Sequence, residues 1–419
     1  MICQNKKNKK MMMTQSVFKT VQGFRNTAHG LAYIRLSLVV LLMGFCNLSI
    51  QAKDGFFEDL VEIFGFEQTT ISKNEYSKII KKEFSITSDG NTILGNKYGK
   101  IEVKTWDKDR VKVTVNIVVE TRSESEAQAV FDRININFDS GETFVSAKTS
   151  IESKQTSWWG WDNDNTEFQI NYEVLIPENG ALDLTNKYGD ADIAIIGGKA
   201  KVAVKYGDFT MEEARNNLVV ELGYGTGKVM RALDMTATVS YSKFRIEQAE
   251  NIVLDTRYSK INVENAADLK MDSRYDNYEV GEARAVNCQA RYGDMDILAV
   301  DNVVCNSRYT EYRIERVSDK ADFNLEFGGA TIEQITKGFS EVMLVGKYTD
   351  YRLTIEPGAS YQLDANAEHA GIKYPSKMKV TQDIEKGQSH TVKGHEGTRN
   401  ARSVIKASLN YGALQVKND

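Results

Sequence analysis

Residues 252–263 read Ile-Val-Leu-Asp-Thr-Arg-Tyr-Ser-Lys-Ile-Asn-Val, and residues 269–280 read Leu-Lys-Met-Asp-Ser-Arg-Tyr-Asp-Asn-Tyr-Glu-Val. Each copy centres on a basic residue, a tyrosine and a small or polar residue. The motif recurs at a nearly constant interval, and its aromatic residues are Tyr188, Tyr206, Tyr224, Tyr241, Tyr258, Tyr275, Tyr292, Tyr309 and Phe327. Self-similarity at a short, fixed period is typical of a repeat architecture.

Apolar and polar residues alternate on both sides of the tyrosine. Ile252 and Leu254 precede Tyr258, while Ile261 and Val263 follow it. Alternation with a period of two predicts strands with one buried face. The alternation shifts once per copy, and we place the shift at the small residue after the tyrosine. Each repeat is then two short strands around a tight bend, with the tyrosine ring on the inward side.

Three architectures can be built from such repeats. A flat meander leaves a long apolar face uncovered, and a propeller needs roughly 40 to 45 residues per blade. A parallel β-solenoid needs one coil per repeat. We therefore predict an all-β fold, a parallel β-solenoid (β-helix) with coils of 17–18 residues.

In a solenoid the equivalent residues of successive coils stack about 4.7–4.9 Å apart. The tyrosines then form a structural column: Tyr188, Tyr206, Tyr224, Tyr241, Tyr258, Tyr275, Tyr292, Tyr309, Tyr348 and Tyr411. Basic residues often precede them, and four of these form a candidate binding surface: Arg257, Arg274, Arg291 and Arg308. The alternative is a solvated rim of ion pairs that contribute little.

Three tryptophans, Trp158, Trp159 and Trp161, lie among turn residues and are a second candidate binding surface. Exposed aromatic rings of this kind contact sugars, peptides or membranes. The structural alternative is a loop whose rings cover the side of the solenoid.

Residues 1–52 read as a secretory signal peptide. Seven basic and no acidic residues occur there, and an apolar run from Leu36 to Phe45 is followed by the small residue Ala52. The alternative is a membrane anchor, but the run is short for a span. We expect an exported protein, in the periplasm or on the cell surface of a bacterium, without a stable transmembrane segment after cleavage.

The net charge of the chain limits the kinds of partner that it can bind. Without those seven basic residues, the 53 basic side chains fall to 46 against 58 acidic ones, a net charge of about −12. Nucleic-acid binding needs a basic surface, so we expect a protein or glycan partner and no nucleic acid.

The remaining segments divide the chain further. Residues 53–84 are predicted to cap the solenoid, with an amphipathic helix over Asp54–Phe66. Residues 85–181 are a first β region with an inserted helix over Ser123–Ile134 and the tryptophan loop. Residues 182–419 hold the solenoid repeats, and both Tyr98 and Tyr411 fit the pattern.

Two cysteines follow the signal peptide, Cys288 and Cys305, at equivalent positions of adjacent coils. They are either a disulfide or, in the interpretation we favour, two buried thiols that pack as small apolar residues.

No pattern in the sequence indicates catalysis, a cofactor or a metal. The histidines after residue 52 are His369, His390 and His395, all beyond the regular repeats. No nucleotide-binding glycine loop, zinc spacing or calcium-binding repeat occurs. His390 and His395 are better explained as part of a mobile surface loop than as metal ligands.

Two segments carry a resemblance to a known family. They are Asn96-Lys97-Tyr98-Gly99-Lys100-Ile101-Glu102-Val103, which leads into Trp106, and Tyr172–Pro177, which leads into Asn186–Ala191. With the signal peptide, they resemble the bacterial envelope family of "putative adhesins", over roughly residues 85 to 419. The resemblance implies a β-helical fold and is nearly silent on activity.

The sequence therefore favours a non-enzymatic envelope protein, a rigid β-solenoid with an extended surface for adhesion or for a protein or glycan partner. One alternative is a carbohydrate-active enzyme, a lyase or hydrolase, because charged ladders on a strand face can carry such chemistry. The other is a scaffold or sensing component that stays in the periplasm.

Overall fold

The structure is a computed structural model that describes residues 73–152 and 167–418. These residues form one sheet of 20 strands and a single α-helix, so the predicted all-β class is confirmed. The signal peptide, the helix over Asp54–Phe66 and the tryptophan loop lie outside the described residues.

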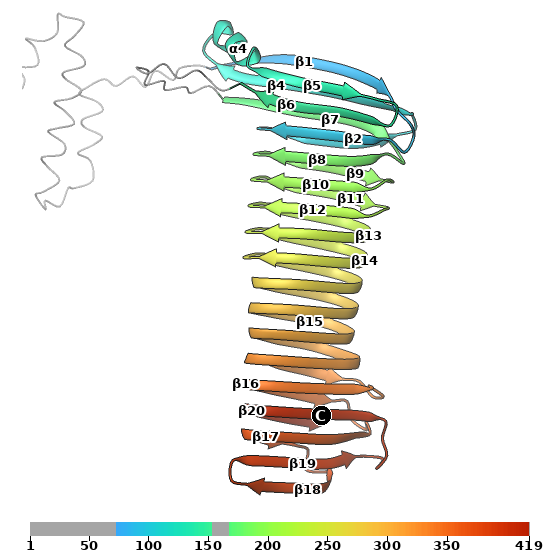
Figure 1. The fold of residues 1–419 in the computed structure, drawn as a ribbon, viewed down its shortest axis with the longest axis vertical. Coiled ribbons are helices and arrows are strands. Elements are labelled where there is room, and N and C mark those ends of the chain that lie inside the picture. Colours follow the sequence, from blue (N-terminus) through green and yellow to red (C-terminus); the bar gives the residue numbers. More distant parts are fainter. Residues whose placement is uncertain (1–72, 153–166, 419) are drawn as a thin grey trace, which may run out of the picture. The chain divides into compact units, whose positions relative to one another are not determined.

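The elements follow the chain as labelled in Figure 1. The first half contains β1 (Asn74–Ser85), β2 (Asn91–Lys97), β3 (Ile101–Trp106), β4 (Arg110–Thr121), α4 (Glu124–Phe131), β5 (Ile134–Ser140), β6 (Phe144–Ile151), β7 (Glu167–Pro177), β8 (Ala181–Lys187), β9 (Ala191–Ile196), β10 (Ala200–Lys205), β11 (Phe209–Ala214) and β12 (Leu218–Gly223). The second half contains β13 (Thr226–Ser240), β14 (Lys243–Arg257), β15 (Lys260–Ile335), β16 (Glu341–Ile355), β17 (Tyr361–Lys373), β18 (Lys379–Lys386), β19 (Ser389–Glu396) and β20 (Ser403–Asn418).

The middle strands pair in parallel, each with the strand one repeat later. Val202 is opposite Val220, and Ile252 is opposite Leu269. The long strand β15 winds through several layers between β14 and β16 (Figure 1). We call one such layer a rung. Because the register equals the sequence period, each apolar residue lies on its equivalent in the next rung.

The burial pattern corrects the predicted position of the tyrosine. Leu254 and Thr256 are buried, Arg257 and Tyr258 are both exposed, and Ser259 is buried again. The alternation therefore shifts at the tyrosine itself and not at the residue after it. Tyr258 is 50% exposed, so the prediction of an inward ring is wrong.

A left-handed backbone at the tyrosine is the physical reason for this outward position. Every aromatic residue that marks a corner has a positive φ, from 52° at Tyr258 to 62° at Tyr98. This conformation costs an L-residue about 1–2 kcal/mol, and it turns the chain while the side chain points to solvent. The next residue then faces inward under a neighbouring rung, and a Cβ on Gly293 would lie 2.0 Å from the Asp276 carbonyl oxygen.

The corner beside Tyr275 contains a buried carboxylate, Asp276, which is 2% exposed. Its Oδ2 accepts hydrogen bonds from Thr256 Oγ1 at 2.7 Å, Ser273 Oγ at 2.9 Å and the Arg274 amide at 2.8 Å. Its Oδ1 accepts one from the Ser259 amide at 2.7 Å. Burial raises the pKa of the Asp276 carboxyl above its ordinary value, and these four hydrogen bonds oppose the shift. The network ties neighbouring rungs together at this corner.

At the N-terminal end, an insertion of the chain extends the sheet. Thr92 of β2 pairs with Leu182 of β8, so the residues between β3 and β8 are an insertion in the regular period. This insertion adds β6 and β7, which pair in parallel with β2 and β3, and β4, which lies antiparallel between β1 and β7. Ser123 caps α4, which packs against β4 and β1. The helix predicted over Ser123–Ile134 is thus present and shorter.

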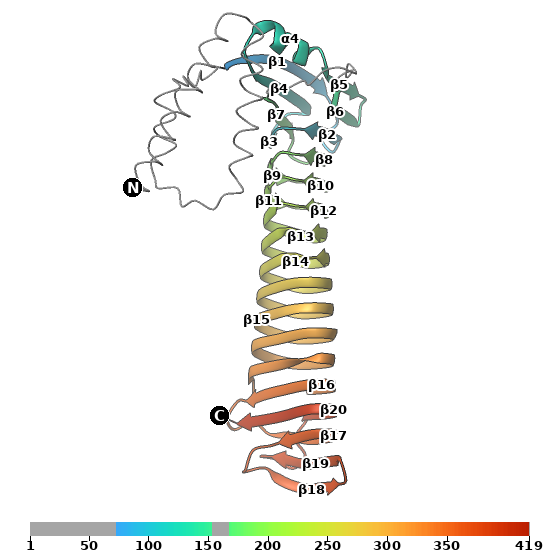
Figure 2. The same cartoon turned by 90° about the vertical axis from the view of Figure 1, so that its left-hand side faces the viewer.

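At the C-terminal end, chain order and spatial order differ. The final strand β20 lies between β16 and β17 and is parallel to both, with Ala407 opposite Leu344 on one side and Ala365 on the other. The antiparallel strands β19 and β18 follow β17 (Figure 2). The last strand in sequence is therefore an interior rung of the stack. His390 and His395 pair within β19, so the prediction of a surface loop around them is wrong.

Cys288 and Cys305 lie inside the stack, as the sequence predicts. Both are buried, and their Sγ atoms are 2.6 Å apart as free thiols. The Tyr312 hydroxyl lies 3.1 Å from Cys288 Sγ.

Within residues 73–152 and 167–418, no helix is long and apolar enough to span a membrane. The same residues contain no cluster of three or more His, Cys, Asp or Glu side chains placed to hold a metal ion.

Candidate functional site

The tyrosines form a continuous outward column, which we call the aromatic column. Successive ring centroids are 4.6–5.3 Å apart, with interplanar angles of 1–17°. In spatial order its rings are Tyr98, Tyr188, Tyr206, Tyr224, Tyr241, Tyr258, Tyr275, Tyr292, Tyr309, Phe327, Tyr348, Tyr411 and His369. Inside the column each ring face is covered by a neighbour, so ring edges are what a ligand would meet.

The four predicted arginines occupy the position before the aromatic column and face solvent. Arg257 and Arg274 pair with acids two residues earlier, Asp255 at 3.6 Å and Asp272 at 3.4 Å. Exposed pairs of this kind contribute about 0–1 kcal/mol. The arginines therefore do not form one uniform strip of positive charge.

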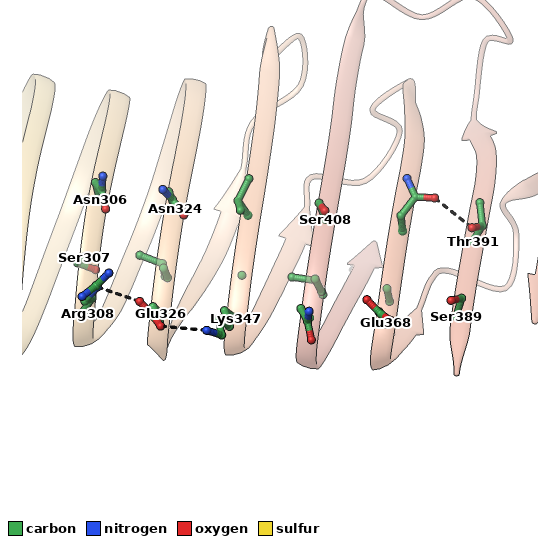
Figure 3. Close-up of a pocket in the computed structure, with 17 residues that line it drawn as sticks. Asn306, Ser307, Arg308, Asn324, Glu326, Lys347, Glu368, Ser389, Thr391 and Ser408 are labelled. Carbon is green, nitrogen blue, oxygen red and sulfur yellow. Dashed lines mark hydrogen bonds and ion pairs between the residues drawn. The ribbon is translucent and has the colours of Figure 1, made fainter. Parts of the chain in front are cut away.

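A concave group of polar side chains lies on the outward face near the C-terminal end. Six neighbouring strand segments there enclose a concavity of about 750 Å³, which we call the polar trough (Figure 3). Its lining residues are Asn306, Ser307, Arg308, Asn324, Leu325, Glu326, Val345, Gly346, Lys347, Asn366, Ala367, Glu368, Ser389, Thr391, Ser408, Leu409 and Asn410. This volume lies within the range of about 300–1,000 Å³ that is usual for ligand pockets.

One row of the trough is made of uncharged side chains that we call the amide row. From β15 towards β19 they are Asn306, Asn324, Val345, Ser408, Asn366 and Thr391. The Thr391 hydroxyl donates to Asn366 Oδ1 at 3.0 Å (Figure 3). The equivalent position carries an acid in some earlier rungs, Asp255 and Asp272, and an uncharged residue in others, Thr185 and Thr238, whereas every member of the amide row is uncharged.

A second row, closer to the aromatic column, carries charges that pair with one another. Glu326 lies between Arg308 at 2.8 Å and Lys347 at 3.5 Å (Figure 3). Asn410 and Glu368 continue the row on the next two strands. Arg308 is thus the one predicted arginine that lines the trough.

Sequence reasoning missed the amide row. Asn306 and Asn324 stand three residues before Tyr309 and Phe327, so alignment of that position could have shown them. Ser408, Asn366 and Thr391 join the row only through the insertion of β20 and the antiparallel pairing of β19, which no repeat pattern indicates. Trp158, Trp159 and Trp161 lie outside the described residues.

Comparison with known proteins gives distant structural likenesses. No protein-family profile matches the chain. No curated protein matches it either.

Among solved structures, the chain is similar to a "putative cell adhesion protein" from Clostridium sporogenes, with 9% identity, a TM-score of 0.17, and coverage of 83% of this chain and 100% of that one. It is also similar to a "putative adhesin" from Bacteroides fragilis, with 12% identity, a TM-score of 0.22, and coverage of 82% and 97%. A "putative lipid binding protein" from Parabacteroides distasonis matches with 13% identity, a TM-score of 0.25, and coverage of 80% and 96%. Proteins named as adhesins are thus among its neighbours, as the sequence resemblance predicts.

Proposed function

We propose that this chain is a non-enzymatic, exported envelope protein whose repeats form a rigid parallel β-solenoid. The solenoid presents an extended outward surface for adhesion, that is, for a protein or glycan partner. In this proposal residues 1–52 are a removed signal peptide, 53–84 a cap, 85–181 a first β region and 182–419 the repeats. The mature protein is in the periplasm or on the cell surface.

The parallel register supports the solenoid. The step between paired strands equals the sequence period, as in the pairs of Leu184 with Val202 and Leu254 with Met271. One coil per repeat requires this equality. The nearly parallel rings of the aromatic column repeat at the same interval.

The polar trough is the observation that carries the binding function. It gathers polar side chains from strands distant in sequence, Asn306 on β15, Ser408 on β20 and Thr391 on β19, on one concave face. The described residues that line it include no histidine or cysteine, and its acids are Glu326, which is ion-paired, and Glu368. This composition suits recognition better than acid–base or nucleophilic catalysis.

Incubation of the mature protein with immobilised envelope and plant glycans tests this function. We expect retention of at least one glycan without release of soluble products. Release of shortened sugars would establish the alternative, a carbohydrate-active lyase or hydrolase.

Protease treatment of intact cells tests the compartment. Cleavage of the protein on intact cells indicates surface display. Cleavage only after the outer envelope is opened indicates the alternative of a periplasmic scaffold or sensing component.

A further inference from the structure

We infer that the polar trough binds a neutral, linear polysaccharide that lies along the stack, with about one sugar per rung. This inference rests on the proposed binding function and names its ligand. It is carried by the charge balance of the trough, by the groups along the amide row and by the spacing of the rungs.

The charge balance favours a neutral ligand. The trough contains two cations, Arg308 and Lys347, and two carboxylates, Glu326 and Glu368. Glu326 contacts both cations, and together with Glu368 it balances their charge, so the trough has no excess positive charge to attract an anionic chain. A nucleic acid or an acidic polysaccharide would need an excess of positive charge.

The functional groups match sugar hydroxyls. An asparagine side chain offers two donors and a carbonyl acceptor, and a serine or threonine hydroxyl both donates and accepts. A sugar hydroxyl also does both, so the amide row can bond it in either direction. Val345, in the middle of the row, is 47% exposed. Its apolar side chain can pack against the C–H groups of a sugar ring.

A peptide strand fits the trough less well. Peptides commonly bind by adding a strand to a free sheet edge, but the strands beneath the trough are paired on both sides, as β20 is with β16 and β17. An extended peptide also advances about 3.3 Å per residue, which does not match the rungs.

The rung spacing suits a chain of sugars. Ring centroids beside the trough are 5.0 Å apart from Phe327 to Tyr348 and 4.7 Å from Tyr348 to Tyr411. An equatorially linked hexose extends its chain by about the length of one ring and one bridging oxygen, which is close to one rung. Successive sugars can therefore meet successive members of the amide row.

Titration calorimetry on the full mature chain tests the inference. The neutral probes are β-1,4-linked hexasaccharides of glucose, mannose and N-acetylglucosamine, and the anionic probe is the β-1,4-linked hexasaccharide of mannuronic acid, which has the same equatorial linkage. We expect at least one neutral probe to bind, more tightly than its own disaccharide because the longer chain reaches more rungs. Tighter binding of the anionic probe, or no binding of any neutral probe, would overturn the inference.

Variants locate the site. The double variant Asn324→Ala with Asn366→Ala should bind the neutral probe about tenfold or more weakly, since each change removes hydrogen bonds worth about 1 kcal/mol. The matched control is Thr185→Ala with Thr238→Ala, at the equivalent outward position of rungs outside the trough. It should leave affinity unchanged, and both double variants should keep the wild-type melting temperature.

The outcomes separate this inference from the proposed function. If a glycan binds and the asparagine variant has no effect, the binding function stands and the trough is the wrong site. If the bound glycan is cut, the non-enzymatic proposal fails, and the variants alone decide whether the trough holds the ligand.

Discussion

The rungs from β13 to β15 and those from β16 to β20 use the same local pattern, but they find their neighbours differently. In the first region each rung pairs with the next one in sequence, as Ile252 does with Leu269. In the second, β16 pairs with β20, a strand far along the chain, with Leu344 opposite Ala407. A repeat pattern thus specifies that a segment is a rung, and only chain connectivity or end effects decide where the rung is placed.

Removal of β20 should have the largest effect, and it should destabilise the second region while leaving the first one folded. A chain that ends at residue 402 loses the buried side chains Ile405, Leu409, Leu414 and Val416, each worth about 1.5–3 kcal/mol. We expect the free energy of unfolding of the C-terminal rungs to fall by more than about 5 kcal/mol, with loss of hydrogen-exchange protection in β16 and β17. Protection in β13 and β14 should remain.

The control truncation ends at Asn418, which keeps the hydrogen bond that the Tyr361 hydroxyl donates to Asn418 Oδ1 at 3.0 Å, and it should change little because it removes Asp419 alone. Equal loss of protection in β13 and β17 would show that the two regions unfold as one unit.

Asp276→Ala tests the regular region at a buried corner. The change leaves four donors without their acceptor, and each unsatisfied buried group costs about 1–3 kcal/mol. Allowing for relaxation, we expect a loss of about 2–4 kcal/mol in urea unfolding. Asp272→Ala, an exposed acid on the same strand, should cost less than about 1 kcal/mol. Similar losses for both would mean that the corner network does not stabilise the stack.

Two substitutions of Tyr258 test what the aromatic column contributes to stability. Tyr258→Ala loses ring stacking on two sides, worth about 0.5–1.5 kcal/mol per pair, and keeps the strained φ of 52°. Tyr258→Gly loses the same stacking and relieves the strain. We expect glycine to be more stable than alanine by about 1 kcal/mol. In a strand the alanine variant is usually more stable than the glycine variant. That order of stability at Tyr258 would contradict the left-handed corner.

The smallest expected effect is on the outward ion pairs. Arg313 contacts Asp296 at 2.6 Å and 3.3 Å with both side chains exposed. Arg313→Ala should cost about 0.5 kcal/mol at low salt and nothing measurable in roughly 1 M salt, because the pair is screened. A loss above about 2 kcal/mol, beyond the usual range for exposed pairs, would show that outward charges help to hold the rungs together.

Much of the fold follows from the sequence because burial repeats with the period. The positions of Leu254, Ile261 and Cys288 inside the stack come directly from alternation. The outward direction of the Tyr258 ring cannot be derived in this way, since alternation does not tell which of two adjacent residues takes the left-handed conformation. The order Tyr348, Tyr411, His369 in the aromatic column was not predictable either.

The candidate site was less predictable than the fold. The place of Arg308 before Tyr309 is enough to identify it, but the amide row around it depends on β20 and β19, which arrive from later in the chain. A surface assembled from strands that are not consecutive has no continuous sequence signature.

Cysteine cross-linking tests the central claim, that the final strand lies between β16 and β17. In a chain with Cys288→Ala and Cys305→Ala, the pair Val345→Cys and Ser408→Cys joins residues opposite each other on β16 and β20. The pair Val345→Cys and Asn366→Cys spans β16 and β17, with β20 between them, beyond the roughly 7 Å limit between Cα atoms for a disulfide. We predict that mild oxidation links the first pair and not the second. Linkage of the second pair without the first would contradict the inserted strand and the trough built on it.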